Sequence, residues 1–103
     1  MDDDFVELVL SAVEQIPPGQ AASYGDIAEL IGRGGPRQVG QVMSRHGPAV
    51  PWWRVVRADG RPVRGLEERA IELLRGDDTP LRGDRVDFPR ARYRPLRSDR
   101  IGP

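Results

Sequence analysis

The sequence predicts a single, mainly α-helical domain that contains a helix-turn-helix and a short β element. Its 103 residues suit one domain. Apolar residues recur at helical spacing in several segments, and two of the shorter segments are joined by the turn Gly34-Gly35. The sequence has no internal repeat or linker. Residues 1–103 are therefore predicted as one unit, with a flexible, Arg-rich tail over about 90–103.

The first predicted helix lies close to the start of the chain. Acidic residues 2–4 precede it, where the helix dipole favours negative charge. Pro17-Pro18-Gly19 ends it. Its apolar stripe has the i, i+3, i+4 spacing of a helix and consists of Phe5, Leu8, Val9, Ala12, Val13 and Ile16.

Residues 23–46 predict the helix-turn-helix itself. Ser23 and Asp26 have the spacing of a capping box, which predicts the start of a short helix. Gly32 is typical of the end of that helix. Pro36 fits the first position of the next helix.

The second of these helices has two different faces. One face is apolar and is predicted to point inward: Val39, Val42 and Met43. The opposite face is small and polar with one long cation: Arg37, Gly40, Gln41 and Ser44. Such a face suits close approach to a DNA groove, although many helical hairpins bind nothing.

Three further elements are predicted in the C-terminal half. Residues 50–56 are largely apolar and β-branched, which predicts an extended segment before a turn at Asp59-Gly60. Leucine spacing predicts a fourth helix over residues 66–76. Val86 and Phe88 predict another short extended segment.

Composition excludes several function classes. The chain has no cysteine, so it has no disulfide, thiolate nucleophile or cysteine-ligated metal. His46 is the single histidine, which excludes a histidine-rich metal site, and no cofactor is predicted. No apolar run is long enough to span a membrane and no signal segment is evident, so a cytoplasmic protein is predicted.

A net charge of zero conceals an uneven distribution of charge. Residues 1–32 carry seven acidic and no basic residues, whereas residues 33–64 carry seven arginines against Asp59 alone. A basic middle beside an acidic first helix is a plausible footprint for a polyanion. An ordinary solvated surface explains the same charges equally well.

Four pieces of the sequence, in order and at the expected distances, resemble one known family. They are Pro17-Pro18-Gly19, the Tyr24-Gly25 helix start, the Arg-x-Val-Gly-x-x-Met run at 37–43, and Pro51-Trp52-Trp53-Arg54-Val55. Together they resemble the C-terminal DNA-binding domain of O6-alkylguanine-DNA alkyltransferases over roughly Phe5 to Asp78. This resemblance implies a winged-helix-like fold.

The fourth piece departs from the alkyltransferase motif Pro-Cys-His-Arg-Val. Trp52 stands where the alkyl-accepting cysteine should be, and Trp53 replaces the histidine that activates it. The glutamate of that relay falls near Asp77. The cysteine replacement is the hallmark of the alkyltransferase-like proteins, which bind alkylated guanine without repairing it. The resemblance therefore implies a protein that is not an enzyme.

The resemblance also implies roles for individual residues. Tyr24 matches the tyrosine that presses the phosphate beside the target nucleotide, and Arg37 matches the finger that fills the gap left by the flipped base. Gly40 matches the small residue that lets the helix lie deep in the minor groove. The predicted DNA-binding set is Tyr24, Arg37, Gln38, Gly40, Gln41 and Ser44.

A pocket for the flipped base is predicted around Trp52, whose ring would contact an added alkyl group. The adjacent Trp53 would point the opposite way in an extended segment, so either tryptophan could belong to the core. Arg64 is the candidate to contact the guanine, with Arg61 as a rival. The predicted pocket set is Val50, Pro51, Trp52, Trp53 and Arg64.

The first hypothesis is a monomeric sensor of double-stranded DNA that contains O6-alkylguanine. By resemblance, it would flag the lesion for nucleotide excision repair proteins. The second is a helix-turn-helix transcription regulator without lesion specificity, but few base-reading side chains lie on the outward helix face. The third is a base-flipping glycosylase with Asp59 or Asp77 as the catalytic carboxylate, which no paired motif supports.

Overall fold

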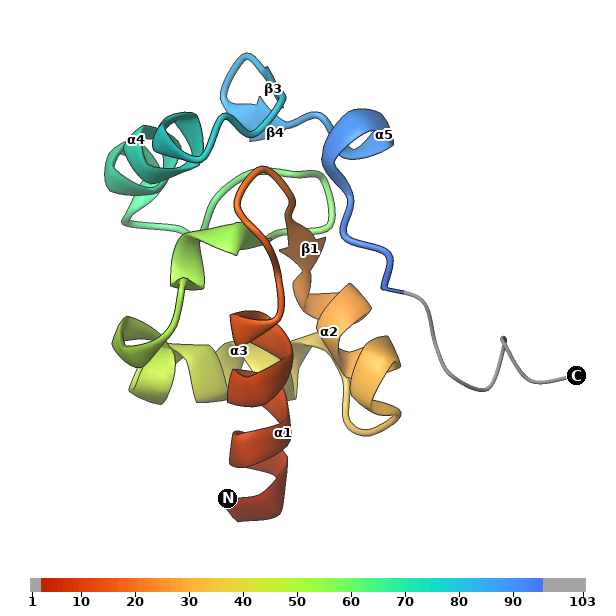
Figure 1. The fold of residues 1–103 in the computed structure, drawn as a ribbon. Coiled ribbons are helices and arrows are strands. Elements are labelled where there is room, and N and C mark those ends of the chain that lie inside the picture. The colour runs from red at the N-terminus through yellow and green to blue at the C-terminus, as the bar shows by residue number, and fades with distance from the viewer. Residues whose placement is uncertain (1–2, 96–103) are drawn as a thin grey trace, which may run out of the picture.

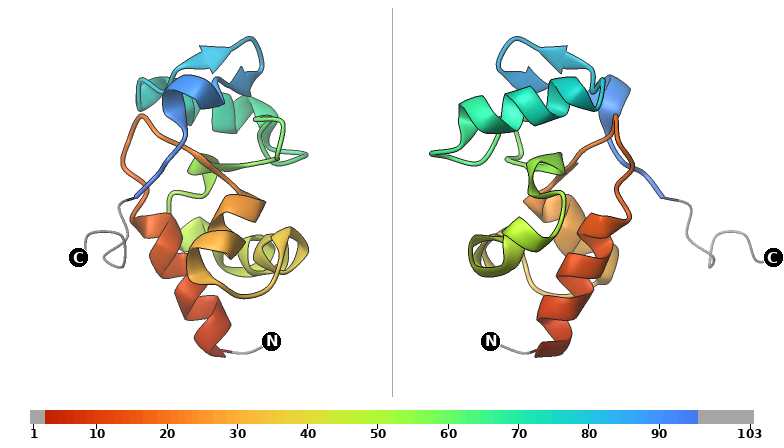
Figure 2. Two further views of the ribbon diagram at one scale, coloured as in Figure 1. Left: turned by 90° about the vertical axis from the view of Figure 1, so that its right-hand side faces the viewer. Right: turned by 60° about the vertical axis from the view of Figure 1, so that its left-hand side comes forward.

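The computed structural model describes residues 3–95. Figure 1 shows α1–α3 in one half of the molecule and α4, the β3–β4 hairpin and α5 in the other, and the same two halves are seen from other sides in Figure 2. The larger elements are α1 (Asp3–Glu14), β1 (Ala22–Ser23), α2 (Tyr24–Ile31), α3 (Pro36–His46), β2 (Val55–Val56), α4 (Glu67–Gly76), β3 (Leu81–Arg82), β4 (Arg85–Val86) and α5 (Phe88–Ala91). Two 3-10 turns, η1 (Gly47–Ala49) and η2 (Trp52–Arg54), lie between α3 and β2.

The first half is a bundle of three helices around a shared apolar core. The predicted stripe of α1 contributes Phe5, Val9, Ala12 and Val13, and the predicted inner face of α3 contributes Val39, Val42 and Met43. The start of α2 has the predicted capping box. Asp26 N–H donates to Ser23 Oγ at 3.0 Å, and Ser23 N–H donates to Asp26 Oδ2 at 3.0 Å. These contacts stabilise the entry to the helix-turn-helix.

A two-residue parallel sheet joins segments that are distant in the sequence. Ala22 pairs with Val55 and Ser23 pairs with Val56. Both of these strands are buried. We call this pairing the clasp, because it brings together the two ends of residues 24–54.

The second half has its own smaller core. Ala21, Val56, Leu74, Val86 and Ala91 are buried together there. The turn that follows β2 requires a glycine at position 60. Gly60 has φ +91°, and a Cβ atom there would lie 2.7 Å from the carbonyl oxygen of Val86.

Two predicted extended segments are partly wrong. Residues 52–54 form η2, and only Val55–Val56 is a strand, so the side chains in this stretch do not simply alternate. Arg85–Val86 is the predicted strand, but Phe88 begins α5 because Pro89 follows it at a position that favours a helix start.

The chain just after residue 90 is packed, in contrast to the predicted flexible tail. Ala91 is buried, and the backbone of Ala21 exchanges hydrogen bonds of 2.9 and 2.8 Å with Ala91 and Tyr93. Arg92 donates to Asp26 Oδ1 at 3.0 Å and lies 4.0 Å from the centre of the Phe88 ring. The prediction is therefore wrong for residues 90–93, and its later part, 96–103, lies outside the described residues.

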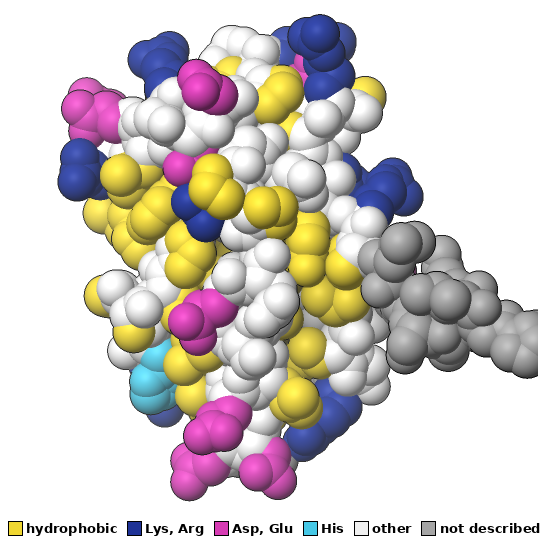
Figure 3. All heavy atoms as spheres, viewed as in Figure 1, with side chains coloured by type: hydrophobic (Ala, Val, Ile, Leu, Met, Phe, Trp, Pro, Cys, Tyr) yellow, Lys and Arg dark blue, Asp and Glu magenta, His cyan; other side chains and the backbone are white. Residues whose placement is uncertain are grey.

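Two features bear on what the protein could bind, the charge on its surface and the length of its helices. Figure 3 shows acidic side chains gathered where α1 begins, while most of the visible basic side chains lie elsewhere. Among residues 3–95, no helix is long and apolar enough to cross a membrane.

Candidate functional site

A cavity of about 290 Å³ lies between the helix-turn-helix and the segment that follows β2. Its lining comes from several elements: Tyr24, Gly40, Met43, Ser44, Gly47, Pro48, Trp52, Val63 and Leu66. No charged side chain belongs to this set. The volume is close to the lower end of the range for small-molecule sites, ~300 Å³. A cavity of this size and chemistry suits an uncharged, partly apolar group.

The two adjacent tryptophans have different environments. Their rings are edge to face, with centroids 5.9 Å apart and planes at 90°. Trp52 lines the cavity and packs against the three-helix core. Trp53 does not line it; its indole N–H donates to Asp77 Oδ2 at 2.8 Å. The cavity therefore has one tryptophan wall, and the second tryptophan holds the chain behind that wall.

Arg54 and Asp77 fix the back of the tryptophan turn. Arg54 Nε and Nη2 donate to the two carboxylate oxygens of Asp77 at 2.8 and 3.1 Å, and Nη1 donates to the Ile16 carbonyl at 3.0 Å. The two side chains are only 12% and 13% exposed. We call this group, with Trp53, the anchor. Arg54 therefore has a structural role, through one backbone carbonyl and one acidic side chain.

The anchor also controls the ionisation of Asp77. Burial alone would raise the pKa of this carboxyl group, but hydrogen bonds from Arg54 and Trp53 and the charge of Arg54 outweigh burial. The net result is a pKa below the ordinary value, so Asp77 is a carboxylate at neutral pH. As an anion that already accepts these bonds, it is poorly suited to act as a general acid.

The outward face of α3 is open to solvent as predicted. Arg37, Gln41 and Ser44 are exposed, and Arg37 has no ion pair or side-chain hydrogen bond with the described residues. A Cβ atom at Gly40 would meet nothing within 4 Å. The fold itself therefore does not require a glycine at this helical position. Gln38 is also exposed, but its Oε1 accepts the Gly35 N–H at 3.0 Å and so caps the helix.

Tyr24 begins α2 directly after β1 and forms another wall of the cavity. Burial raises the pKa of its hydroxyl group, and the charge of Arg57 lowers it only in part. Tyr24 is therefore neutral at physiological pH. A neutral hydroxyl is a hydrogen-bond donor, as contact with a phosphate oxygen requires.

The structure distinguishes Arg64 from Arg61, the two candidates from the sequence to contact the guanine. Arg64 is exposed and lies between Val63 and Leu66, which both line the cavity. Arg61 instead contacts Asp59 at 2.7 Å and Asp84 at 3.7 Å, away from the cavity. Arg64 is thus the better placed of the two for a ligand in the cavity.

Several predicted pocket residues do not line the cavity, and several lining residues were not predicted. Val50 is buried in the core and Pro51 is half-buried beside Trp52. Sequence reasoning missed the lining residues Met43, Gly47, Pro48, Val63 and Leu66. Val63 and Leu66 could have been found from the sequence, because they are the apolar residues on either side of Arg64.

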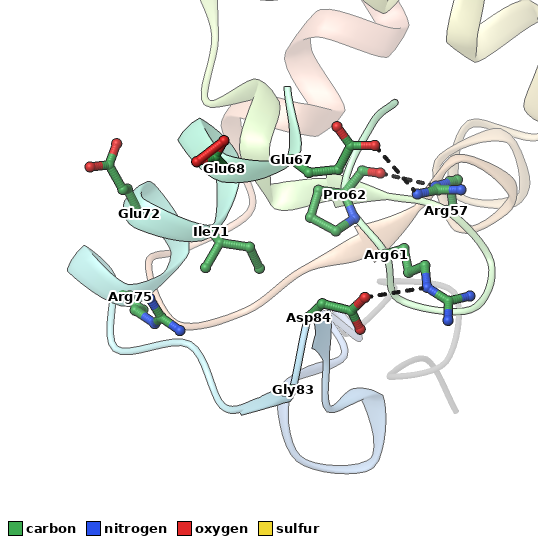
Figure 4. A pocket seen from close by; sticks show the side chains of 10 residues that line it. All are labelled: Arg57, Arg61, Pro62, Glu67, Glu68, Ile71, Glu72, Arg75, Gly83 and Asp84. Atoms are coloured by element: carbon green, nitrogen blue, oxygen red, sulfur yellow. Dashed lines mark hydrogen bonds and ion pairs between the residues drawn. The ribbon is translucent and has the colours of Figure 1, made fainter. Parts of the chain in front are cut away.

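A second, larger hollow of about 920 Å³ lies on the other side of residues 61–67. Figure 4 shows Pro62 and Ile71 between charged side chains from α4, from residues 57–61 and from the β3–β4 hairpin. Glu67 lies 4.0 Å from Arg57, and Asp84 lies 3.7 Å from Arg61. We call this hollow the charged groove. Because its charges are mixed and largely paired, it presents no unbalanced field to an ionic ligand.

Comparison with known proteins gives matches over most of the chain. The family model described as "6-O-methylguanine DNA methyltransferase, DNA binding domain" matches residues 4–78. "Alkyltransferase-like protein 1" of Schizosaccharomyces pombe is 32% identical over 108 residues, which cover 90% of this chain and 97% of the relative. A "DNA base-flipping protein" of Escherichia coli K12 is 42% identical over 98 residues, which cover 89% and 76%.

A solved structure has the same fold. It is S. pombe Atl1 in complex with damaged DNA containing O6-carboxymethylguanine, which matches with a TM-score of 0.82 and 29% sequence identity. The match covers 92% of this chain and 99% of that one. The predicted mainly helical, helix-turn-helix class is therefore confirmed.

Proposed function

Because this chain belongs to the family of the 6-O-methylguanine DNA methyltransferase DNA-binding domain, we propose that it is a non-enzymatic sensor of alkylated DNA. It binds double-stranded DNA through α3 and accepts a flipped O6-alkylguanine in the cavity beside Trp52. The observation that carries this proposal is an uncharged cavity with a tryptophan at the position of the family's nucleophile. Binding without chemistry leaves a persistent complex.

The cavity has the chemistry that a flipped, alkylated base requires. The ring of Trp52 and the side chains of Met43 and Val63 offer apolar contact to an alkyl group. Arg64 is exposed and lies in the chain between the lining residues Val63 and Leu66, which supports it as the guanidinium group that donates to guanine O6 or N7. Opening a base pair costs a few kcal/mol, and less for a damaged pair, which favours lesions over normal guanine.

The exposed face of α3 supports binding in the minor groove. Arg37 is exposed at the first turn, where it can enter the duplex and occupy the space of the flipped base. The open position at Gly40 allows the helix backbone to approach the groove floor. Minor-groove edges discriminate base pairs poorly, so binding would be largely independent of sequence. This argues against the alternative of an operator-specific regulator.

The residues considered for a chemical reaction are either absent from the sequence or do not line the cavity. The sequence has no cysteine to accept an alkyl group. The two carboxylates considered for a glycosylase, Asp59 and Asp77, do not line the cavity and are held by Arg61 and Arg54. A base held beside Trp52 would therefore meet no nucleophile or general base from either residue.

Four finer features belong to the same proposal. The β3–β4 hairpin supports a winged-helix-like description of the domain. A complex that does not turn over needs a further system to remove the lesion, and we propose nucleotide excision repair proteins in that role. We also propose that the protein acts as a monomer and in the cytoplasm.

The test is fluorescence-anisotropy binding to matched duplexes that contain guanine or O6-methylguanine. We expect the wild type to prefer the lesion, and Trp52→Ala and Arg37→Ala to lose that preference. Arg82→Ala is the matched control for Arg37→Ala, because Arg82 is exposed on the hairpin and does not line the cavity. Tryptophan fluorescence, followed in the same titrations, reports whether the indole rings become covered.

Equal binding of the wild type to both duplexes would contradict the sensor and leave a general DNA-binding protein. Lesion preference retained by Trp52→Ala would contradict the proposed role of the cavity. Release of free base from the lesion duplex would contradict the absence of catalysis.

A further inference from the structure

Residues 88–93, which we call the strap, join the second half of the molecule to the start of the helix-turn-helix. The strap begins at Phe88 in α5, which packs against the smaller core, and ends at Tyr93, which packs against the three-helix core. Between them, Arg92 forms a parallel bridge with Ala21, just before β1. Figure 1 shows the chain descending from α5 to the level of α2. The strap therefore connects the two cores beside the strand that leads into α2.

Arg92 is the residue of the strap that reaches the first turn of α2. Its guanidinium carbon lies 4.0 Å from the centre of the Phe88 ring, which favours a planar cation over the ring face. Its Nη1 donates to Asp26 Oδ1 at 3.0 Å. The two side chains of this ion pair are 29% and 26% exposed, so water screens it less than an ion pair on the open surface. Arg92 therefore orients the Asp26 carboxylate.

The Asp26 carboxylate in turn holds the backbone on both sides of Tyr24. Its other oxygen, Oδ2, accepts the Ser23 N–H at 3.0 Å, and Asp26 N–H donates to Ser23 Oγ at 3.0 Å. Tyr24, the first residue of α2, lies between these two bonded residues. Without Arg92, the carboxylate can turn toward water and release the Ser23 N–H, which would loosen the start of α2.

We propose that Arg92 is a positioning residue for DNA binding, which acts through Asp26 on Tyr24. The inference rests on the proposed contact between the Tyr24 hydroxyl group and a DNA phosphate. That hydroxyl group must lie within hydrogen-bond distance of the phosphate oxygen, so a small displacement of the start of α2 weakens the contact. The strap holds Tyr24 in place before DNA arrives and so reduces the loss of freedom on binding. Arg92 itself need not touch DNA.

The experiment is a double-mutant cycle, measured by fluorescence anisotropy with the O6-methylguanine duplex. The variants are Tyr24→Phe, Arg92→Ala and the combination of the two. We expect Arg92→Ala alone to weaken binding by roughly fivefold, because the tyrosine is placed less firmly. Tyr24→Phe removes the hydroxyl group that makes the contact. In that background, Arg92→Ala should weaken binding by at most roughly twofold, since its effect passes through the missing group.

Arg90→Ala is the matched control for Arg92→Ala. Arg90 is an exposed arginine of the same strap, without an ion pair or side-chain hydrogen bond to the described residues. Its removal takes away the same charge, so a general loss of attraction to DNA is matched. Arg92→Lys keeps the charge and a donor toward Asp26, and should restore most of the affinity. Thermal unfolding checks each variant; if Arg92→Ala does not fold, Arg92→Gln takes its place in the cycle.

Three outcomes would overturn the inference while lesion sensing stands. They are equal affinity of Arg92→Ala and Arg90→Ala, an unchanged affinity in Tyr24→Phe, and an equal loss from Arg92→Ala with and without the tyrosine hydroxyl group. A loss in Arg92→Lys as large as in Arg92→Ala would overturn the role of the ion pair with Asp26. A wild type that binds DNA without preference for the lesion would overturn the proposed function alone, and one that binds no DNA would overturn both proposals.

Discussion

The cavity and the charged groove lie on opposite sides of residues 61–67. They differ in whether the charged side chains around them already have partners within the protein. The cavity is lined without charge, and Arg64, which lies between its lining residues Val63 and Leu66, has no ion pair or hydrogen bond with another described residue. In the groove, Arg57 and Arg61 already contact Glu67 and Asp84. The smaller hollow is thus the one whose interactions a ligand would complete.

The difference shows why volume and charge alone are poor guides to a binding site. The groove is about 920 Å³ and the cavity about 290 Å³, yet several of the charges that line the groove are already paired within the protein. Exposed ion pairs contribute little to stability and hold no fixed ligand geometry. A rigid apolar wall such as Trp52, held from behind by the anchor, keeps its shape without a ligand. The comparison therefore favours the cavity as the site.

The largest expected effect comes from removing the anchor, because this would loosen the cavity wall. Asp77→Ala leaves the buried guanidinium of Arg54 with the Ile16 carbonyl as its acceptor. We expect the free energy of unfolding to fall by about 3 kcal/mol. Urea denaturation measures this loss, and Asp77→Asn, which keeps an acceptor, should lose less. A loss below about 0.5 kcal/mol would contradict the structural role of the anchor.

The anchor also predicts a pH dependence. Because the pKa of Asp77 in the folded protein lies below its ordinary value, the unfolded chain binds a proton more readily than the folded chain. The stabilisation is therefore complete at neutral pH and is lost as the pH falls through about 4 and below. Urea denaturation at a series of pH values should show a steeper loss in the wild type than in Asp77→Asn. Equal slopes would contradict the lowered pKa.

The next largest expected effect concerns the open helical position at Gly40. Gly40→Ala should raise the free energy of unfolding by up to about 1 kcal/mol, because alanine is the better helix former and its Cβ meets no atom within 4 Å. Lesion-DNA affinity should nevertheless fall severalfold, because the added methyl group lies on the face of α3 that we propose approaches DNA. Denaturation and anisotropy titrations separate the two effects.

Gly76→Ala is the control for this prediction. Gly76 is also helical, and a Cβ atom there meets nothing within 4 Å, but it ends α4 and does not line the cavity. Gly76→Ala should keep the DNA affinity of the wild type. Equal binding by both alanine variants and the wild type would argue against close approach of α3 to DNA.

The smallest expected effect is in the groove. Arg61→Gln removes partly exposed ion pairs with Asp59 and Asp84, and should cost less than about 1 kcal/mol of unfolding free energy. It should leave lesion preference unchanged, whereas Arg64→Gln should weaken binding to the O6-methylguanine duplex. Anisotropy titration of both variants tests this contrast. The reverse result would move base contact to Arg61.

Periodicity and capping signals were sufficient to predict the first half of the fold. The apolar stripes of α1 and α3 and the capping box at Ser23 are local features, and local features are visible in a sequence. The tryptophan turn was harder, because β-branched neighbours predict a strand while the anchor holds residues 52–54 in a 3-10 turn. Asp77 and Ile16, which make that anchor, are distant in the sequence.

The site was predictable only in part for the same reason. Trp52, Tyr24 and Arg37 stood out through the family resemblance, but the division between Trp52 and Trp53 depends on a hydrogen bond to Asp77. The position of Val63 and Leu66 at the cavity accompanies a turn between them that no motif specified. Long-range contacts of this kind decide which of several similar residues reaches a cavity.

The clasp has a consequence for the order in which a working protein can form during synthesis. Tyr24 follows β1 and Trp52–Arg54 precedes β2, so pairing of these strands brings two cavity walls together. The helices need only local contacts and can form early, whereas the clasp must close a long loop and is expected to be slower. A nascent chain released up to α3 would hold a recognition helix with no cavity beside it. If the proposed function holds, such a chain could contact DNA before it could distinguish a damaged base from an undamaged one.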